Sequence, residues 1–312
     1  MPIGDGPMRR APRSLALGLA AVALASGVAI ASTTTGTASQ IRALVAASTK
    51  IQKLTPALIT ELSQISTLET RLAYPGVGME CLTACAFGDL SSKRTIVLYG
   101  DSHAMMWLPA VLAAEPKYRV DLFWDPTCPL VAIPGLAFAD GTPPSNCAAF
   151  RASSVAAIRS IDPKLVLLGE RTYQVVTMPG SKPISNATWA KALKTTIRQV
   201  KTRTTGVAVV QDIVAFNWNV LLCVAAYPSA IQKRCSSANP NSKAPGHQAA
   251  EKTAAVATGA KFVVTIPWFC TSTRCSPVVG SNFVHYDQGH VSVPYARYLA
   301  GVFGAAIAPL LR

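Results

Sequence analysis

The chain has 312 residues, and 50% of them are apolar, which is enough for one large core or two small ones. Its formal charge of +14 permits anionic envelope polymers, anionic lipid or nucleic acid as neighbours. Nucleic acid is the weakest candidate, because the basic residues are scattered, the aromatic residues do not interleave with them, and no nucleic-acid-binding motif is present. We therefore predict no nucleic-acid partner, and a single α/β domain with an N-terminal appendage.

Residues 1–39 are typical of an export segment. Arg9, Arg10 and Arg13 precede an uncharged apolar run that ends near residue 31, and a polar linker follows it. The run ends in a small-x-small site that suits cleavage, but it is also long enough to stay in the membrane. The sequence leaves a cleaved signal peptide and a retained membrane anchor both open. In either case it predicts an extracytoplasmic protein, secreted or anchored to the outer side of the cytoplasmic membrane.

Apolar residues recur at helical spacing after the linker, with a break around Pro56. This pattern predicts two helices, or a helical stalk, over residues 40–78, ahead of a catalytic domain over residues 79–312. In that domain, short β-rich apolar runs alternate with segments of helical character. The predicted strands are 95–99, 119–124, 165–168, 206–211 and 261–266, and the predicted helices are 105–114, 147–161, 186–204, 246–258 and 291–311.

Continuous apolar strands that alternate with helices are typical of a parallel sheet covered on both faces. The predicted fold class is therefore α/β, a three-layer flavodoxin-like sandwich with roughly five parallel strands. Ligands bind such folds at the carboxyl ends of the strands, so residues that directly follow strands are the candidates for a site.

The cysteines form an even set that falls into neighbouring pairs along the chain. Short loops close at the least entropic cost, so we predict local disulfides. No CxxC pair is present, which makes a zinc site the weaker interpretation, and we predict no metal. Disulfides also indicate an oxidising compartment, in agreement with the export segment. The predicted pairs are Cys81–Cys85, Cys128–Cys147, Cys223–Cys235 and Cys270–Cys275.

A candidate nucleophile follows the first predicted strand, in Gly100-Asp101-Ser102-His103. A serine on a tight strand-to-helix turn is exposed at the sheet edge, and its own N–H lies in the first helical turn, where it can stabilise an oxyanion. Gly100 permits the turn, and Asp101 can hold it through hydrogen bonds to the backbone. We predict a structural role for His103, because adjacent residues on a turn point apart. The motif alone also fits an ordinary helix N-cap.

A carboxylate and an imidazole stand three residues apart before the last predicted helix, as Asp287 and His290. Asp287 can accept from one ring nitrogen of His290 and fix its tautomer, which leaves the other nitrogen to take the proton of Ser102. The alternative is that His290 caps the last helix and Asp287 is a solvated loop residue. Read together with the Ser102 turn, the pair predicts a Ser-His-Asp triad.

The two motifs together resemble the SGNH hydrolase family, and more closely the SGNH domains that accompany membrane-embedded acyltransferase-3 proteins of bacterial envelopes. The resemblance covers most of residues 80–310. It implies an SGNH fold, Ser102, Asp287 and His290 as the triad, and a local disulfide pairing. It rests on Cys85-Ala-Phe-Gly-Asp89, Thr95-Ile-Val-Leu-Tyr-Gly-Asp-Ser-His-Ala104, Trp107, Pro109-Ala110, Cys128-Pro129, and Phe269-Cys270 to Cys275 running into Tyr286-Asp-Gln-Gly-His-Val-Ser292.

The chain departs from the wider family in the other oxyanion-hole residues. Typical members have a Gly after the second strand and an Asn in a Gly-x-Asn-Asp block after the third, whereas this chain has Leu168-Gly-Glu-Arg171 and no Asn. We predict that Thr127 or Cys128 supplies a backbone donor instead. Arg171 is the candidate to contact an oxyanion or an acidic substrate.

The leading hypothesis is transfer of an acyl group to or from a hydroxyl of an envelope glycan through an acyl-Ser102 intermediate, with acetyl as the first candidate for the acyl group. It needs no metal or organic cofactor. The resemblance implies a separate acyltransferase-3 membrane protein as acyl donor. Two alternatives stay open, an SGNH carbohydrate esterase and a non-catalytic glycan-binding envelope module.

Overall fold

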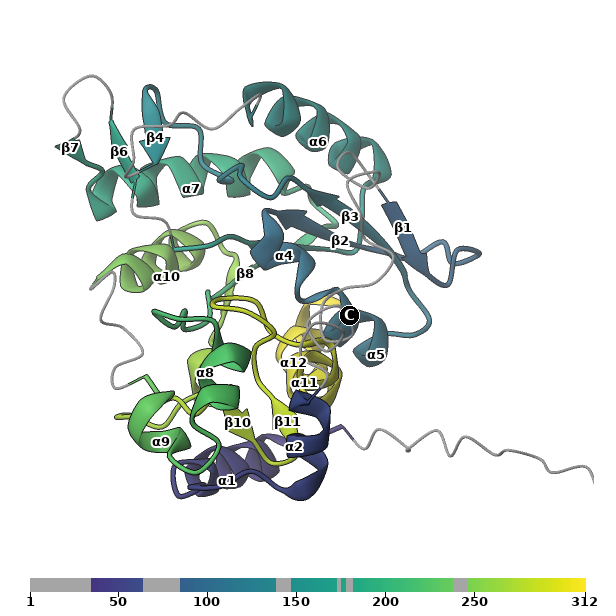
Figure 1. Ribbon diagram of the computed structural model, residues 1–312. Helices are drawn as coiled ribbons and strands as arrows, with labels where there is room; N and C mark the ends of the chain where they lie inside the picture. The colour runs from purple at the N-terminus through teal and green to yellow at the C-terminus, as the bar shows by residue number, and fades with distance from the viewer. Residues whose placement is uncertain (1–34, 64–84, 139–146, 173–174, 178–181, 238–245) are drawn as a thin grey trace, which may run out of the picture. The chain divides into compact units, whose positions relative to one another are not determined.

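The computed structural model of the chain contains a central sheet of six strands in the order β1-β3-β2-β5-β8-β9. Continuous apolar segments form its buried strands, among them β2 and β3, which lie side by side in Figure 1. The structure describes residues 35–63, 85–138, 147–172, 175–177, 182–237 and 246–312, so the predicted export segment and Cys81 lie outside it. β1 pairs antiparallel with β3, and the other pairings are parallel. The predicted α/β sandwich is confirmed. The strands are β1 (Cys85–Gly88), β2 (Thr95–Gly100), β3 (Arg119–Trp124), β5 (Leu165–Gly169), β8 (Gly206–Val210) and β9 (Lys261–Val263).

The sheet differs from the predicted strands at its two edges. β1 is an additional strand of four residues, and half-buried and exposed side chains alternate along it, so it lacks the continuous apolar pattern of the buried strands. At the other edge, β9 ends at Val263 rather than at residue 266. The next residues form the 3-10 turn η2 (Ile266–Trp268), because Pro267 lacks the N–H that a strand would use.

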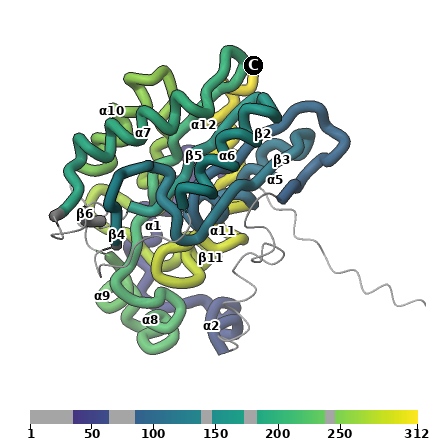
Figure 2. The backbone as a smooth tube through the Cα atoms, turned by 90° about the horizontal axis from the view of Figure 1, so that it is seen from above, coloured from purple at the N-terminus to yellow at the C-terminus, as the bar shows by residue number. Residues whose placement is uncertain are grey.

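Alternate side chains of the strands point into two cores on opposite faces of the sheet. Val97 and Tyr99 of β2 pack with Trp189 in one core, and Leu98 packs with Trp107 in the other. One face is covered by α6 (Cys147–Ile161), α7 (Asn186–Val200) and α10 (His247–Ala257), with α7 between the other two (Figure 2). The opposite face carries α5 (Leu108–Ala114), α11 (Val293–Tyr298), α12 (Ala300–Ile307) and η3 (Ala308–Leu310).

The predicted helices are present, but the first and the last are interrupted. The first consists of α4 (Ser102–Met105) and α5, and Pro109 stands in the first turn of α5, where its missing N–H does no harm. The last begins at Val293 rather than at residue 291, because the Ser292 side chain caps it by accepting from the Tyr295 N–H.

The segment expected as a helical stalk contains α1 (Ala38–Ser48) and α2 (Pro56–Leu62). Thr37 and Thr55 cap these helices, which is why they begin there. Their apolar side chains, Ile41 and Leu58 among them, belong to the core that also contains Trp107, on the face of the sheet that α5 covers. Where it is described, this segment is therefore packed against the domain. None of the described helices has the length and apolar character of a membrane span.

The remaining described elements are short. They form two small antiparallel sheets and two short helices between the longer elements. They are β4 (Leu136–Phe138), β6 (Val175–Thr177), β7 (Lys182–Pro183), β10 (Val278–Val279), β11 (Asn282–Phe283), α8 (Val220–Ala226) and α9 (Ile231–Arg234).

Disulfides cross-link nearby parts of the chain at three places among the described residues. Three of the predicted pairs are confirmed, and Cys85 is disulfide-bonded as well, although its predicted partner lies outside the described residues. Such cross-links persist in oxidising compartments. The confirmed pairs are Cys128–Cys147, Cys223–Cys235 and Cys270–Cys275.

Candidate active site

The Ser102 turn is shaped by the close approach of two parallel strands. A Cβ on Gly100 would lie 1.7 Å from the Gly169 carbonyl oxygen and 2.9 Å from the Ala104 Cβ, so only glycine fits where β2 ends. The Asp101 carboxylate is fully buried and caps α4, because its Oδ1 accepts from the His103 N–H at 2.7 Å. The two residues predicted to support the turn therefore do so, and Ser102 stands at the first position of α4.

The structure brings Ser102, Asp287 and His290 together although 188 residues separate the serine from the histidine. His290 Nε2 is 2.8 Å from Ser102 Oγ, and His290 Nδ1 is 2.6 Å from Asp287 Oδ2. Asp287 Oδ1 also accepts from the N–H groups of Gly289 and His290, at 2.8 and 2.7 Å. A proton on Nδ1 leaves Nε2 to accept from Ser102.

The carboxylate of this trio is ionised. Burial would raise the pKa of Asp287, but the hydrogen bond from His290, the charge of that ring and two backbone N–H groups lower it to about 2. The side chains of His290 and Asp287 remain 23% and 32% exposed, so both are accessible from solvent.

The loop of residues 285–291, which we call the Asp287–His290 loop, is held from two sides. Its own backbone forms a bridge between His285 and Val291, and the Tyr286 ring stacks on the His290 ring with centroids 5.5 Å apart. From the segment after β8, the Phe216 N–H donates to the Gln288 carbonyl oxygen at 2.7 Å. His285 is buried, and burial lowers its pKa to about 4, so this ring is neutral.

The predicted oxyanion donors after β3 are already engaged. The Thr127 N–H donates to Asp125 Oδ1 at 3.0 Å, and the Cys128 N–H donates to the Asp125 carbonyl oxygen at 3.2 Å. This local turn uses both N–H groups and argues against the predicted role for either residue. By contrast, no described residue accepts from the Ser102 N–H, which lies in the first turn of α4.

The segment after β5, where typical family members carry the Asn, is held by buried carboxyl groups. The Arg171 N–H donates to Asp101 Oδ2 at 2.9 Å, which leaves the exposed Arg171 side chain at the carboxyl edge of the sheet. Glu170 is buried, and its Oε2 accepts from the Leu130 N–H at 2.9 Å. Burial and the nearby Glu251 and Asp101 carboxyl groups raise the pKa of Glu170 well above its ordinary value.

One residue beside the site was missed in the sequence. Asp212 follows β8 closely, and its Oδ1 is 2.6 Å from Nδ1 of His103, the neighbour of Ser102. The signal was a carboxylate two residues after an apolar strand, and Asp101 stands in a similar place directly after β2.

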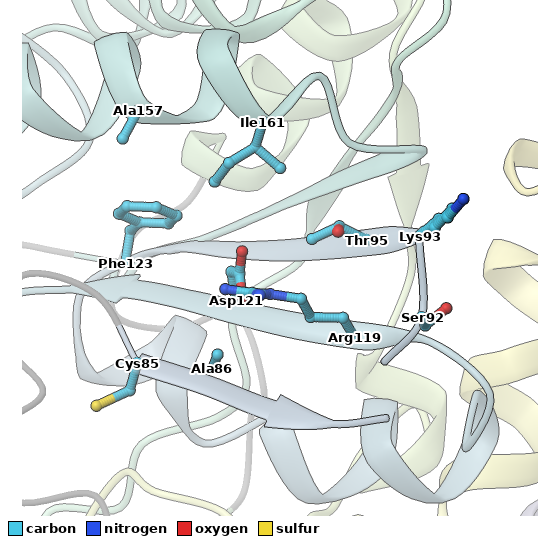
Figure 3. A pocket seen from close by; sticks show the side chains of 10 residues that line it. All are labelled: Cys85, Ala86, Ser92, Lys93, Thr95, Arg119, Asp121, Phe123, Ala157 and Ile161. Carbon is cyan, nitrogen blue, oxygen red and sulfur yellow. Dashed lines mark hydrogen bonds and ion pairs between the residues drawn. The ribbon is translucent and has the colours of Figure 1, made fainter. Parts of the chain in front are cut away.

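A separate cavity of about 510 Å³ lies away from these residues (Figure 3). Its lining includes Thr95 and Arg119, the first residues of β2 and β3, whereas Ser102 follows the carboxyl end of β2. Arg119 forms an ion pair with Asp121 there, at 2.7 Å. This cavity therefore lies at the opposite edge of the sheet from the candidate active site.

The comparisons with known proteins concern the fold and the family of the chain. The periplasmic domain of a lipopolysaccharide acetyltransferase from Salmonella ser. Paratyphi A has a similar fold, with a TM-score of 0.58 and 15% sequence identity, over 80% of this chain and 98% of that one. No curated protein matches the chain. Residues 71–305 match the family described as the SGNH domain fused to AT3 domains, which supports acyl transfer or ester hydrolysis as the type of reaction. The chain therefore belongs to the family of SGNH domains fused to AT3 domains.

Proposed function

We propose that this domain is an extracytoplasmic serine O-acyltransferase that moves an acyl group to or from hydroxyls of an envelope glycan, with acetyl as the first candidate for the acyl group. The observation that carries the proposal is the unbroken hydrogen-bond chain from Ser102 Oγ through His290 to the ionised Asp287. The chain supplies the three groups that a serine acyl transfer requires, which are a nucleophilic oxygen, a ring nitrogen that accepts its proton, and a carboxylate that orients the ring.

In the first half of the reaction, Ser102 Oγ attacks the carbonyl carbon of an ester while His290 Nε2 takes the serine proton. Asp287 stabilises the imidazolium, and the Ser102 N–H donates to the developing oxyanion. When the carbonyl re-forms, the bond to the alcohol breaks, and His290 gives its proton to that alcohol. The product of this half is acyl-Ser102.

In the second half, His290 takes the proton of an acceptor hydroxyl, whose oxygen attacks the acyl-Ser102 carbonyl. The ester bond to Ser102 breaks, and the proton returns to Ser102 Oγ. An acceptor glycan gives transfer, and water gives hydrolysis, so a carbohydrate esterase is the close alternative. Arg171 supports an acidic acceptor, because its charged side chain is exposed at the carboxyl edge of the sheet.

The location and the acyl supply belong to the same proposal. The disulfides favour an extracytoplasmic site, and the structural neighbour is described as a periplasmic domain of a lipopolysaccharide acetyltransferase. The family description places such domains beside AT3 domains. We propose that an acyltransferase-3 membrane protein supplies the acyl group here, and that the N-terminal segment holds the chain at the membrane if it is retained.

The test is acyl labelling of Ser102. The full chain, produced with export, is incubated with 4-nitrophenyl acetate, and the peptide that contains Ser102 is analysed by mass spectrometry, with Ser102→Ala as control. If the acetyl group is lost from Ser102 in water alone, the esterase is supported. If it is lost only after a glycan is added, the transferase is supported. If wild type and Ser102→Ala behave alike, catalysis is excluded and the non-catalytic glycan-binding module takes its place.

A further inference from the structure

A second histidine–aspartate pair is buried next to the Ser102 turn. His103 Nδ1 and Asp212 Oδ1 are 2.6 Å apart, and the two residues are only 2% and 5% exposed. The acyl-transfer steps described above do not use either group. Burying two ionisable side chains has a desolvation cost, and this buried pair stands directly beside the proposed nucleophile.

The Asp212 carboxylate joins three segments at the carboxyl edge of the sheet. Besides His103, it accepts from the Thr172 N–H at 2.7 Å, after β5, and from the Ile213 N–H at 2.8 Å, after β8. Burial would raise the pKa of Asp212, but His103 and these backbone groups lower it. Burial would lower the pKa of His103, but the Asp212 carboxylate raises it. The proton between them is therefore held firmly, and α4 is tied to the ends of two strands.

His103 also lies against the Asp287–His290 loop, and the segment that follows Asp212 is hydrogen-bonded to it. The rings of His103 and His290 have centroids 4.9 Å apart. A Cβ built on Gly289 would meet Cε1 and Nε2 of His103 at 3.7 Å, so the imidazole lies in contact distance behind that glycine. The segment that begins with Asp212 continues to Phe216, whose N–H donates to the loop at Gln288.

We propose that His103 and Asp212 form a positioning pair for the acyl transfer proposed above, on which this inference rests. The pair fixes the first turn of α4, which carries Ser102, relative to the loop that carries His290. In this way it maintains the 2.8 Å contact between Ser102 Oγ and His290 Nε2. Misplacement of a reacting atom by about 1 Å can cost about 100-fold in rate, so the pair acts on the rate of acylation rather than on ester binding.

The experiment compares variants that remove the hydrogen bond with one that preserves it. His103→Leu removes the Nδ1 donor, Asp212→Asn removes the charge, and His103→Asn keeps an amide N–H donor near the Nδ1 position. The matched control is His247→Leu, because His247 is also buried and paired with a carboxylate, Glu251, at 3.5 Å. Its ring packs on Trp189 of α7, in the helix layer that covers one face of the sheet.

The acylation rate of the full chain is measured by stopped-flow release of 4-nitrophenolate over a range of ester concentrations, with the unfolding temperature beside it. We expect His103→Leu and Asp212→Asn to lower the maximal rate about 100-fold at an unchanged half-saturating concentration, and His103→Asn to keep most of it. We expect His247→Leu to lower the unfolding temperature and leave the rate unchanged.

Two results overturn the inference. One is wild-type acylation in His103→Leu or, if that variant does not fold, in Asp212→Asn. The other is loss of rate in His103→Asn as large as in Asp212→Asn, which would make the ring itself, rather than its hydrogen bond, the requirement. A wild-type chain whose Ser102 is never acylated overturns the proposed function as well, so the two failures are distinguishable.

Discussion

The Asp287→Asn variant keeps the shape of the proposed triad and should nevertheless prevent acylation of Ser102. Asp287 uses one oxygen for two backbone N–H groups and the other for the Nδ1 proton of His290. Asparagine has one acceptor oxygen and one donor NH₂ group, so it cannot fill both roles. If its oxygen faces the backbone, its NH₂ faces Nδ1. The ring proton must then move to Nε2, which can no longer accept the proton of Ser102.

The opposite orientation of the amide is disfavoured by the backbone. It would aim the NH₂ group at the N–H groups of Gly289 and His290, and two half-buried donors would lose their acceptor. A fully buried donor that loses its acceptor costs about 1–3 kcal/mol and a half-buried one costs less, so the two losses together, about 2 kcal/mol, favour the first orientation by more than about tenfold. The wrong tautomer therefore dominates, and we expect acylation to slow by about 10⁴-fold, as the same change does in serine proteases.

Rapid-mixing measurement of 4-nitrophenolate release from 4-nitrophenyl acetate reports this rate, and thermal unfolding checks that the variant is folded. Asp287→Ala is the matched control, because it removes the carboxylate without forcing a tautomer, and it should therefore react faster than Asp287→Asn. Acylation of folded Asp287→Asn within about tenfold of wild type would refute the tautomer argument.

Three further predictions follow from the same geometry. Gly100→Ala should destabilise the domain by at least about 3 kcal/mol in urea unfolding, because its Cβ would overlap the Gly169 carbonyl oxygen; unchanged stability would contradict the strand contact. The pKa of Asp287 lies at about 2 instead of 3.8, and with 32% of the side chain exposed this is worth about 1–2 kcal/mol. Because the folded-state pKa is the lower one, this stability is present above pH 3.8 and is lost as the pH falls through 2. The difference in free energy of unfolding between wild type and Asp287→Ala, measured by urea titration, should therefore become smaller over that pH window. Arg171→Gln should leave the unfolding temperature unchanged and should lower the rate of transfer to acidic glycans more than the rate of transfer to neutral ones. An equal loss of rate, relative to wild type, for both acceptors would show that Arg171 does not recognise the acceptor.

The parallel strands could be predicted because burial on both faces leaves a continuous apolar run, as in β5, where all five residues are buried. β1 could not, because it is short and lies at an edge, where one face of the strand needs no apolar side chain. The same reasoning applies to the site. The rule that ligands meet the carboxyl ends of parallel strands identified Ser102 as a candidate from its position alone.

Hydrogen bonds made by loops were the part that the sequence could not predict. The expected role of Thr127 and Cys128 conflicts with the turn at Asp125, which depends on backbone angles that no residue pattern specifies. His103 was expected to be structural because neighbouring residues on a turn point apart. Its side chain does point away from solvent, but toward Asp212, 109 residues further along the chain, and only the strand order brings the two together.

Three buried carboxyl groups explain how loops from separate strands form one rigid edge. Asp101, after β2, accepts from Arg171, after β5; Asp212, after β8, accepts from Thr172, also after β5. Glu170 completes the series by accepting from Leu130, after β3.

Each bond joins the ends of two different strands, and a backbone N–H bonds more strongly to an ionised carboxylate, as at Asp212 with its lowered pKa, than to a neutral acceptor. In this chain the segment after β5 thus uses its backbone and its Glu170 side chain to hold the edge together. The Arg171 side chain is exposed at the place where typical relatives present an asparagine to the oxyanion. An exposed guanidinium at this edge suits recognition of an acidic acceptor, and this difference is why we favour transfer over hydrolysis.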